Sequence, residues 1–195
     1  MNNKIIRAKK SITKKEYKLL IAHTKGDDSL KDFSKLRLLR IFVLLYYSGM
    51  RINEVSQITF KHIHEILKTG ETTIVTFKTK SERILYFSDE AKKEIKKSFS
   101  LANENLDNHY IIASWNKPTT RLHEISLINL VNKYMKKVLG KSFTSHSFRQ
   151  GLLTEMGSRS INPKIIQSFI GHCDVKTTLR YIKPTAHDVK MSLVR

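Results

Sequence analysis

The chain is short of cysteine, acidic residues and long apolar runs, and each shortage excludes something. Its single cysteine, Cys173, permits neither an intrachain disulfide framework nor a thiolate metal site, which suits a reducing cytosol. The longest apolar run, residues 41–47, is far too short to span a membrane. The first residues are charged and lack the apolar segment of a signal peptide. We therefore expect a cytoplasmic protein with no membrane partner.

What the chain has instead is positive charge. Lysine and arginine number 36 against 17 acidic residues, a formal net charge of +19 over 195 residues. The excess is spread over both halves of the chain, so the folded surface itself must be positive. Such a surface attracts polyanions, of which nucleic acid is the usual one. Anionic lipid, or simple solubility, is the alternative that charge alone leaves open.

The chain contains enough apolar residues, 40%, to form one globular core. Residues 1–11 are basic and unpatterned, and we expect a flexible lead. Thr13 followed by Glu16 is a capping box that predicts a helix. Residues 36–47 are apolar nearly all round, which predicts a central buried helix that Gly49 ends. Arg51 then falls in a tight turn.

The middle of the chain changes its periodicity. Residues 63–67, 72–77 and 82–87 are rich in β-branched and aromatic residues and are separated by turn residues. They predict a small three-stranded antiparallel sheet. A helix from Ser88 to about residue 102 follows, and then an irregular stretch over residues 103–125.

The pattern of apolar residues in the last third of the chain predicts four further helices. They cover residues 127–138, 146–156, 163–170 and 175–182, and Gly140, Gly157 and Gly171 are expected to end the first three. The fold class is therefore mainly α with a small antiparallel sheet. No linker divides the chain, so residues 12–183 form one domain, and residues 184–195 form a C-terminal tail.

Two histidines, two arginines and a tyrosine carry the chemistry. His146 and Arg149 are three residues apart on one helix and so share a face. An imidazole beside a guanidinium suits a phosphate, because arginine donates two parallel hydrogen bonds to its oxygens. A solvated basic face is the plainer interpretation of that pair.

His172 and Tyr181 lie too far apart to serve one phosphorus atom from a continuous helix, but Gly171 and Asp174 break the helix between them. Tyrosine ionises near pH 10, so a nucleophilic Tyr181 would need help. Arg51, Arg149 and the histidines would stabilise both its phenolate and a phosphorane. A core tyrosine and a helix-capping histidine are the alternatives. Glu54, three residues after Arg51, is placed to orient that arginine.

A leaving alkoxide needs a proton, and lysines at the turn of the second hairpin are candidates. Lys78 and Lys80 both fit by spacing, although simple anchoring of a phosphate is the commoner role for a lysine in a turn. The chain has no carboxylate cluster at metal-ligand spacing, and we expect no metal or other cofactor.

The ordered set of motifs resembles the catalytic domain of the tyrosine recombinases, the phage-integrase family, over residues 11–185. The motifs are Gly-Met-Arg-Ile-Asn-Glu at 49–54, a hairpin lysine, His-Ser-Phe-Arg at 146–149, Ile-Gly-His at 170–172, and Thr-Thr-Leu-Arg-Tyr at 177–181. The resemblance implies a mainly helical catalytic-domain fold. The implied site comprises the clamping arginines Arg51 and Arg149, the histidines His146 and His172, the hairpin lysine Lys78, the nucleophile Tyr181, and Glu54 in support.

The resemblance also implies a reaction and partners. Tyrosine attacks a DNA phosphate and forms a 3′-phosphotyrosyl intermediate, and rejoining then integrates, excises, inverts or resolves DNA without metal or ATP, often for mobile genetic elements. Four protomers act on two double-stranded DNA sites, and residues 184–195 would dock on a neighbouring protomer. Most members carry a further N-terminal DNA-clamping domain. We therefore expect either a fragment or a short member similar to the fimbrial-switch invertases.

Three other interpretations remain open at this point. A regulator or remnant with the same fold would bind DNA without cutting it. A type IB topoisomerase or a telomere resolvase shares the chemistry but not the outcome. An RNA-binding protein would present stacking aromatics on a sheet, whereas Tyr86, Phe87 and Phe77 on the hairpin are better explained as packing residues.

Overall fold

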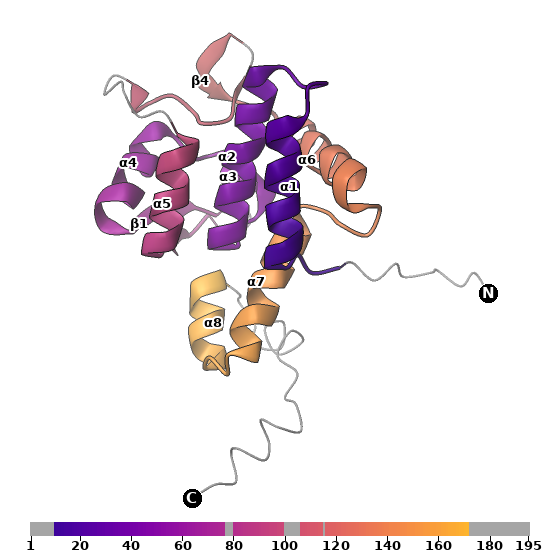
Figure 1. Cartoon of the computed structure of the whole chain (residues 1–195). Helices are drawn as coiled ribbons and strands as arrows, with labels where there is room; N and C mark the ends of the chain where they lie inside the picture. Colours follow the sequence, from indigo (N-terminus) through magenta and orange to yellow (C-terminus); the bar gives the residue numbers. More distant parts are fainter. Residues whose placement is uncertain (1–9, 77–79, 100–105, 115, 172–195) are drawn as a thin grey trace, which may run out of the picture.

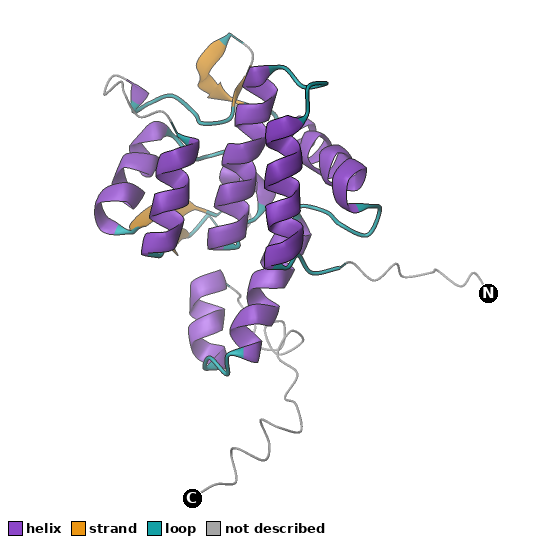
Figure 2. Cartoon of the chain, in the orientation of Figure 1, coloured by secondary structure: helices purple, strands orange, loops and turns teal. Residues whose placement is uncertain are grey.

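A computed structural model describes residues 10–76, 80–99, 106–114 and 116–171 of the chain. Within these ranges the protein is mainly helical, with two small antiparallel sheets (Figures 1 and 2). No helix in these ranges is long and apolar enough to cross a membrane. The predicted helix at 175–182 and the tail at 184–195 lie outside the described residues, as does most of the predicted lead.

The first helix, α1 (Lys14–Gly26), begins where the capping box predicts. The backbone N–H of Thr13 donates to the Glu16 carboxylate at 2.9 Å. This bond satisfies a donor just outside the helix, and the acidic side chain also suits the positive end of the helix dipole.

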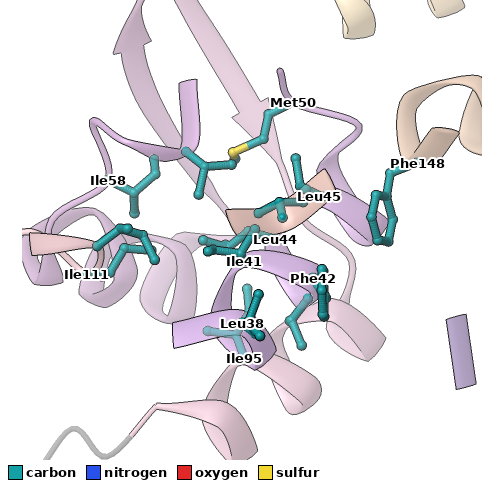
Figure 3. Close-up of a cluster of buried hydrophobic side chains, with 14 of the residues drawn as sticks. Leu38, Ile41, Phe42, Leu44, Leu45, Met50, Ile58, Ile95, Ile111 and Phe148 are labelled. Carbon is teal, nitrogen blue, oxygen red and sulfur yellow. The ribbon is translucent and has the colours of Figure 1, made fainter. Parts of the chain in front are cut away.

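Helix α2 (Asp32–Ser48) is the centre of the hydrophobic core, as predicted from its apolar surface. It packs against α1, α5 and α7. Figure 3 shows its side chains meeting residues from the rest of the chain. Full burial of one such side chain contributes roughly 1.5–3 kcal/mol, so this helix is the main apolar support of the fold. The labelled cluster comprises Leu38, Ile41, Phe42, Leu44, Leu45, Met50, Ile58, Ile95, Ile111 and Phe148.

Two short helices, α3 (Ile52–Val55) and α4 (Phe60–Thr69), follow α2. The prediction of a strand at 63–67 was wrong, because those residues belong to α4. Phe60, Ile63 and Ile66 are its buried residues, a three-residue spacing that lies along one helix face. The β-branched isoleucines pointed to a strand, and burial of this face overrides that preference.

The sheet is correspondingly smaller than predicted. Strands β1 (Glu71–Val75) and β2 (Glu82–Tyr86) form a two-stranded antiparallel hairpin. A second two-stranded sheet, β3 (Ala113–Ser114) with β4 (Lys117–Arg121), lies in the stretch predicted to be irregular. In the sequence between the two sheets lies α5 (Asp89–Ser98), and its N-cap is Ser88, as predicted. The hydroxyl of Ser88 accepts a hydrogen bond from the N–H of Ala91 at 3.3 Å.

Three helices complete the described chain: α6 (Glu124–Leu139), α7 (His146–Ser158) and α8 (Pro163–Ile170). Helix α7 runs from the main core, where Phe148 stacks on Phe42, to the lower end of Figure 1. There it packs with α8 around a small separate cluster of Leu153, Ile166 and Ile170. This pair of helices is tied to the main body through α7 and through contacts of α8 with β2.

The N-terminal segment lies directly against α7. The N–H of Ile12 donates to the carbonyl of Ser147 at 3.1 Å. A side chain at Gly151 would collide with this segment, since its Cβ would lie 2.1 Å from the carbonyl oxygen of Ile12. Glycine at this position therefore allows α7 to pack against the backbone.

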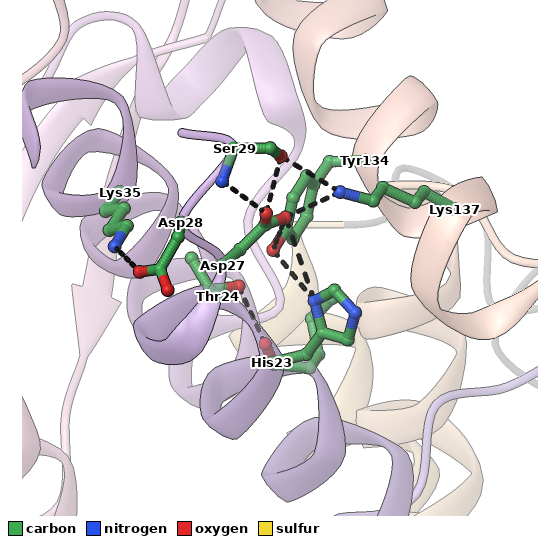
Figure 4. Close-up of polar contacts among 9 residues, drawn as sticks. His23, Thr24, Asp27, Asp28, Ser29, Lys35, Tyr134 and Lys137 are labelled. Carbon is green, nitrogen blue, oxygen red and sulfur yellow. Dashed lines mark hydrogen bonds and ion pairs between the residues drawn. The ribbon is translucent and has the colours of Figure 1, made fainter. Parts of the chain in front are cut away.

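A polar network joins the end of α1 to α6 (Figure 4). Asp27 accepts hydrogen bonds from Lys137 at 2.7 Å, from the hydroxyl of Tyr134 at 3.1 Å and from the hydroxyl of Ser29 at 2.5 Å. Lys137 first, and then Ser29, hold the pKa of Asp27 well below its ordinary value. The network supplies partners for a carboxylate in a largely covered position.

Substitution of Gly151 tests the close approach of the N-terminal segment. We expect Gly151→Ala to lower the free energy of unfolding by about 1–3 kcal/mol, the usual range for overpacking, as measured by urea denaturation. Gly26→Ala is the matched control, because no atom lies within 4 Å of its added Cβ. Equal stability of the two variants would show that residue 12 does not pack on α7.

Acid titration tests the Asp27 network. The pKa of Asp27 is lower in the folded than in the unfolded chain, so its stabilising contribution is present at neutral pH. That contribution is lost as the pH falls below the ordinary aspartate value of about 3.9. We expect Asp27→Asn to lower the melting temperature at pH 7 and the difference from wild type to shrink in acid. Asp28→Asn, at a side chain that is 98% exposed, should change little at either pH.

Candidate active site

The turn between α2 and α3 presents Arg51. Gly49 adopts a left-handed conformation with φ of 58°, and its N–H donates to the carbonyl of Leu45 at 3.1 Å. Met50 is buried in the core. The next residue, Arg51, is the first exposed residue after the buried end of α2. It lies in the tight turn that the sequence predicts.

Glu54 holds Arg51 in place. Its carboxylate accepts from the backbone N–H of Arg51 at 2.7 Å and from Nη1 of the same residue at 3.0 Å. The side chain of Arg51 is 43% exposed, whereas that of Glu54 is 2% exposed. The hydrogen bond expected between these residues is thus present, and it fixes an arginine that faces solvent to a carboxylate that does not.

Arg149 is buried, with 2% of its surface exposed. Its Nη1 donates to the carbonyl of Gly49 at 3.0 Å, and its Nη2 donates to the carbonyl of Ile170 at 2.7 Å. One guanidinium therefore joins α7 to the turn before Arg51 and to the end of α8. Because protein carbonyls anchor it, the orientation of this guanidinium is set before any ligand arrives.

Arg51, His146 and Arg149 line one pocket of about 240 Å³ at the N-terminus of α7. His146 is the first residue of that helix and is exposed. The N-terminus of a helix carries partial positive charge, which adds to that of the guanidinium groups. The other lining residues are Met50, Ile52, Asn53, Glu124 and Ser145.

Three predicted site residues, Lys78, His172 and Tyr181, lie outside the described residues. The structure brings together the others: Arg51, His146 and Arg149 at the pocket, and Glu54 behind Arg51.

Two residues at the site were missed in the sequence. Arg83 donates from Nη1 to Glu54 at 2.8 Å, and burial lowers the pKa of its guanidinium while Glu54 opposes that effect. Its signal was the alternation along β2, which places Arg83 and Leu85 on the covered face. Glu124 places a carboxylate in the pocket at the start of α6, and no pattern in the sequence indicated it.

The same alternation corrects the expectation for the aromatic residues of the hairpin. Phe87 is buried, as expected of a packing residue, but Tyr86 is 48% exposed, and Phe77 lies outside the described residues. The strand thus covers an arginine and exposes a tyrosine, which residue type alone would not indicate.

Such a pocket is suited to an anion with several oxygen atoms. Two guanidinium groups and a helix N-terminus supply positive charge and directed N–H donors, and His146 supplies an imidazole. Phosphate diesters meet this description, and nucleophilic displacement at phosphorus requires stabilisation of charge on the non-bridging oxygens.

The sequence profile described as the phage integrase family matches residues 10–187, nearly the whole chain. The chain belongs to the phage integrase family. This result confirms the resemblance found in the motifs, and the described part of the site lies inside the matched range.

Relatives in sequence include tyrosine recombinases. The chain is 28% identical to tyrosine recombinase XerA of Pyrococcus furiosus over 187 residues, which cover 95% of the chain and 61% of the relative. It is 24% identical to tyrosine recombinase XerD of Halalkalibacterium halodurans, over 92% of the chain and 58% of the relative. The chain thus spans about three fifths of the length of these relatives.

Solved structures show the same fold. A crystal structure of XerA recombinase matches with a TM-score of 0.68 and 20% identity, over 95% of this chain and 64% of that one. The Tn1549 transposon integrase in complex with a circular intermediate DNA matches with a TM-score of 0.69 and 18% identity, over 98% and 67%. The catalytic domain of bacteriophage HP1 integrase matches with a TM-score of 0.56 and 14% identity, over 94% of each chain.

Proposed function

We propose that this chain is the catalytic domain of a site-specific DNA recombinase that cuts and rejoins strands through a 3′-phosphotyrosyl intermediate. The observation that carries the proposal is the convergence of Arg51, His146 and Arg149 on one pocket. Membership of the phage integrase family and similarity to named tyrosine recombinases support it. The net charge of +19 suits a double-stranded DNA substrate.

In the proposed reaction Tyr181 loses its phenol proton to solvent, and the resulting phenolate oxygen attacks the scissile phosphorus. A phosphotyrosyl bond forms, and the bond from phosphorus to the 5′-oxygen of the next nucleotide breaks. Arg51 and Arg149 donate to the non-bridging oxygens, where negative charge grows. His146 and His172 donate further hydrogen bonds, and Lys78 protonates the departing 5′-oxygen.

The second step reverses the first. A 5′-hydroxyl from another strand attacks the phosphotyrosyl bond, the new diester forms, and Tyr181 leaves. Because one phosphodiester replaces another, the reaction needs no ATP, and the guanidinium groups act where other enzymes use a metal. Pairwise exchange at two DNA sites suggests four protomers, and a DNA substrate suggests a cytoplasmic enzyme.

Removal of Arg149 tests the proposed phosphate clamp. On nicked suicide duplexes drawn from the flanks of its own gene, the wild type should accumulate a covalent protein–DNA adduct. We expect Arg149→Ala to slow this step by at least about 100-fold, as for loss of one charge-stabilising donor. Binding to duplex DNA should change only a few-fold, because other basic groups carry the affinity.

Arg149 also supports the fold through the carbonyls of Gly49 and Ile170, so a second variant is needed. Arg149→Lys keeps the charge but has no planar fork to serve both carbonyls and a phosphate. We expect it to melt cooperatively and still to cleave far more slowly than wild type. Cleavage at the wild-type rate by either variant would remove Arg149 from the chemistry.

The identity of the general acid is tested with a modified leaving group. We expect Lys78→Ala to slow cleavage by roughly 100-fold or more, within the usual range for general acid catalysis. A substrate with sulfur at the 5′-bridging position should restore the rate, because a thiolate leaves without a proton. Lys80→Ala, two residues further along the chain, is the control. Rescue of the Lys80 variant in place of the Lys78 variant would transfer the role to Lys80.

A further inference from the structure

Arg83 is a buried cation that the proposed reaction does not use. It lies on β2 with its side chain 5% exposed, so direct contact with a DNA phosphate is not its function. Its Nη1 donates to Glu54 at 2.8 Å, and its Nη2 donates to the carbonyl of Phe169 at 3.1 Å. It therefore touches two elements of the site without lining the pocket.

The first of these contacts bears on the charge of Arg51. A buried carboxylate paired with Arg51 alone would form a pair with no net charge. With Arg83 on the other oxygen of Glu54, the three groups carry a net charge of +1, and Arg51 is the exposed member. Because Glu54 and Arg83 are buried, water screens their charges less than it would at the surface, and a phosphate bound to Arg51 senses this difference. Arg83 therefore offsets the carboxylate that orients Arg51.

The second contact bears on the end of α8. The last carbonyls of a helix have no partner within the helix and carry partial negative charge. Here Arg83 donates a hydrogen bond to the carbonyl of Phe169, and Arg149 donates one to the carbonyl of Ile170. Two cations thus fix the end of the helix that leads, through one residue, to His172.

Gly171 allows Arg83 to lie this close. It has a positive φ of 67°, and a Cβ there would lie 3.0 Å from Cδ and 3.2 Å from Nε of Arg83. The glycine before His172 therefore serves both the turn that ends α8 and the packing of the arginine against it.

We propose that Arg83 is a positioning residue of the recombinase site. It preserves the positive charge of Arg51 by pairing with Glu54, and it holds the end of α8 from which the chain continues to His172. This inference rests on the proposed function, since it assigns a task in the same reaction.

The test compares Arg83→Met with Arg159→Met, the same change at an arginine whose side chain is 68% exposed and pairs with Glu155. On a duplex that the wild type cleaves, we expect Arg83→Met to slow single-turnover cleavage by roughly 10- to 100-fold, as for groups that hold a site's ligands in place. DNA affinity should change only a few-fold. Arg159→Met should behave as wild type, and equal rates for the two variants would overturn the proposal.

Two readouts separate positioning from general loss of stability, with all rates measured well below the melting temperature of each variant. First, Glu54→Gln added to Arg83→Met restores the net charge of +1 and should recover part of the rate. Second, a methylphosphonate at the scissile position lacks the negative charge, so the effect of Arg83→Met should shrink there. Two results together would show that Arg83 has only a structural role. The first is that the cleavage rate of the double variant falls by the full product of the two single effects. The second is that Arg83→Met slows cleavage of the methylphosphonate as much as that of the normal substrate.

The free protein provides an independent check. In a double-mutant cycle of urea unfolding, Arg83→Met and Glu54→Gln should be coupled by at least about fivefold in the unfolding constant. Additive effects would overturn the pairing. A wild type that never forms an adduct would remove the proposed function and the positioning role together. A wild type that cleaves beside an equally active Arg83→Met would remove the positioning role alone.

Discussion

The anchoring of the Arg149 guanidinium by the carbonyls of Gly49 and Ile170 is the interaction on which the site depends. These two residues are far apart in the sequence, and each lies at the end of a helix. Gly49 comes two residues before Arg51 in the sequence, and Ile170 comes two residues before His172. A buried guanidinium must have its donors satisfied, because an unpaired charge in the core is costly. The carbonyls of both helix ends satisfy donors of the buried Arg149, and these contacts hold the two helix ends together at the pocket.

The hydrophobic core sets the remaining geometry. Helix α2 is buried on most sides, so its end at Ser48 is fixed by packing on α1, α5 and α7. The left-handed conformation of Gly49 and the burial of Met50 then fix the position at which Arg51 reaches the surface. The start of α7 is fixed in the same way, because Phe148 stacks on Phe42 of α2. Both guanidinium groups of the pocket are thus positioned by the same central helix.

Much of this was accessible from the sequence, because it rests on local rules. The capping box at Thr13, the buried helix ended by Gly49, and the reach of Glu54 to Arg51 each depend on residues a few positions apart. The pairing of Arg149 with backbone carbonyls does not, since any carbonyl has the same chemistry whatever the residue type. Part of the helix at Phe60–Thr69 was predicted as a strand because β-branched residues favour strands. Burial of one helix face outweighs that preference in the folded protein.

Arg83 shows a different limit of sequence reasoning. Charged residues on a strand are expected to face solvent, yet β2 covers Arg83 and exposes Ile84 and Tyr86. Arg83 can occupy the covered face because Glu54 and the end of α8 lie against that face and supply partners for its charge. Neither partner is near Arg83 in sequence. The small β3–β4 sheet was missed for a simpler reason. Strand β3 has only two residues, and β4 is exposed along its whole length, so neither shows an alternating pattern.

The measurement that tests the central claim most directly is identification of the residue joined to DNA. The adduct from a suicide duplex would be digested with nuclease and protease, and the modified peptide sequenced by mass spectrometry. The account predicts a nucleotide attached through its 3′-phosphate to the peptide containing Tyr181, and a free 5′-hydroxyl on the released strand. Attachment to another residue, or cut DNA with no phosphate on the protein, would contradict it.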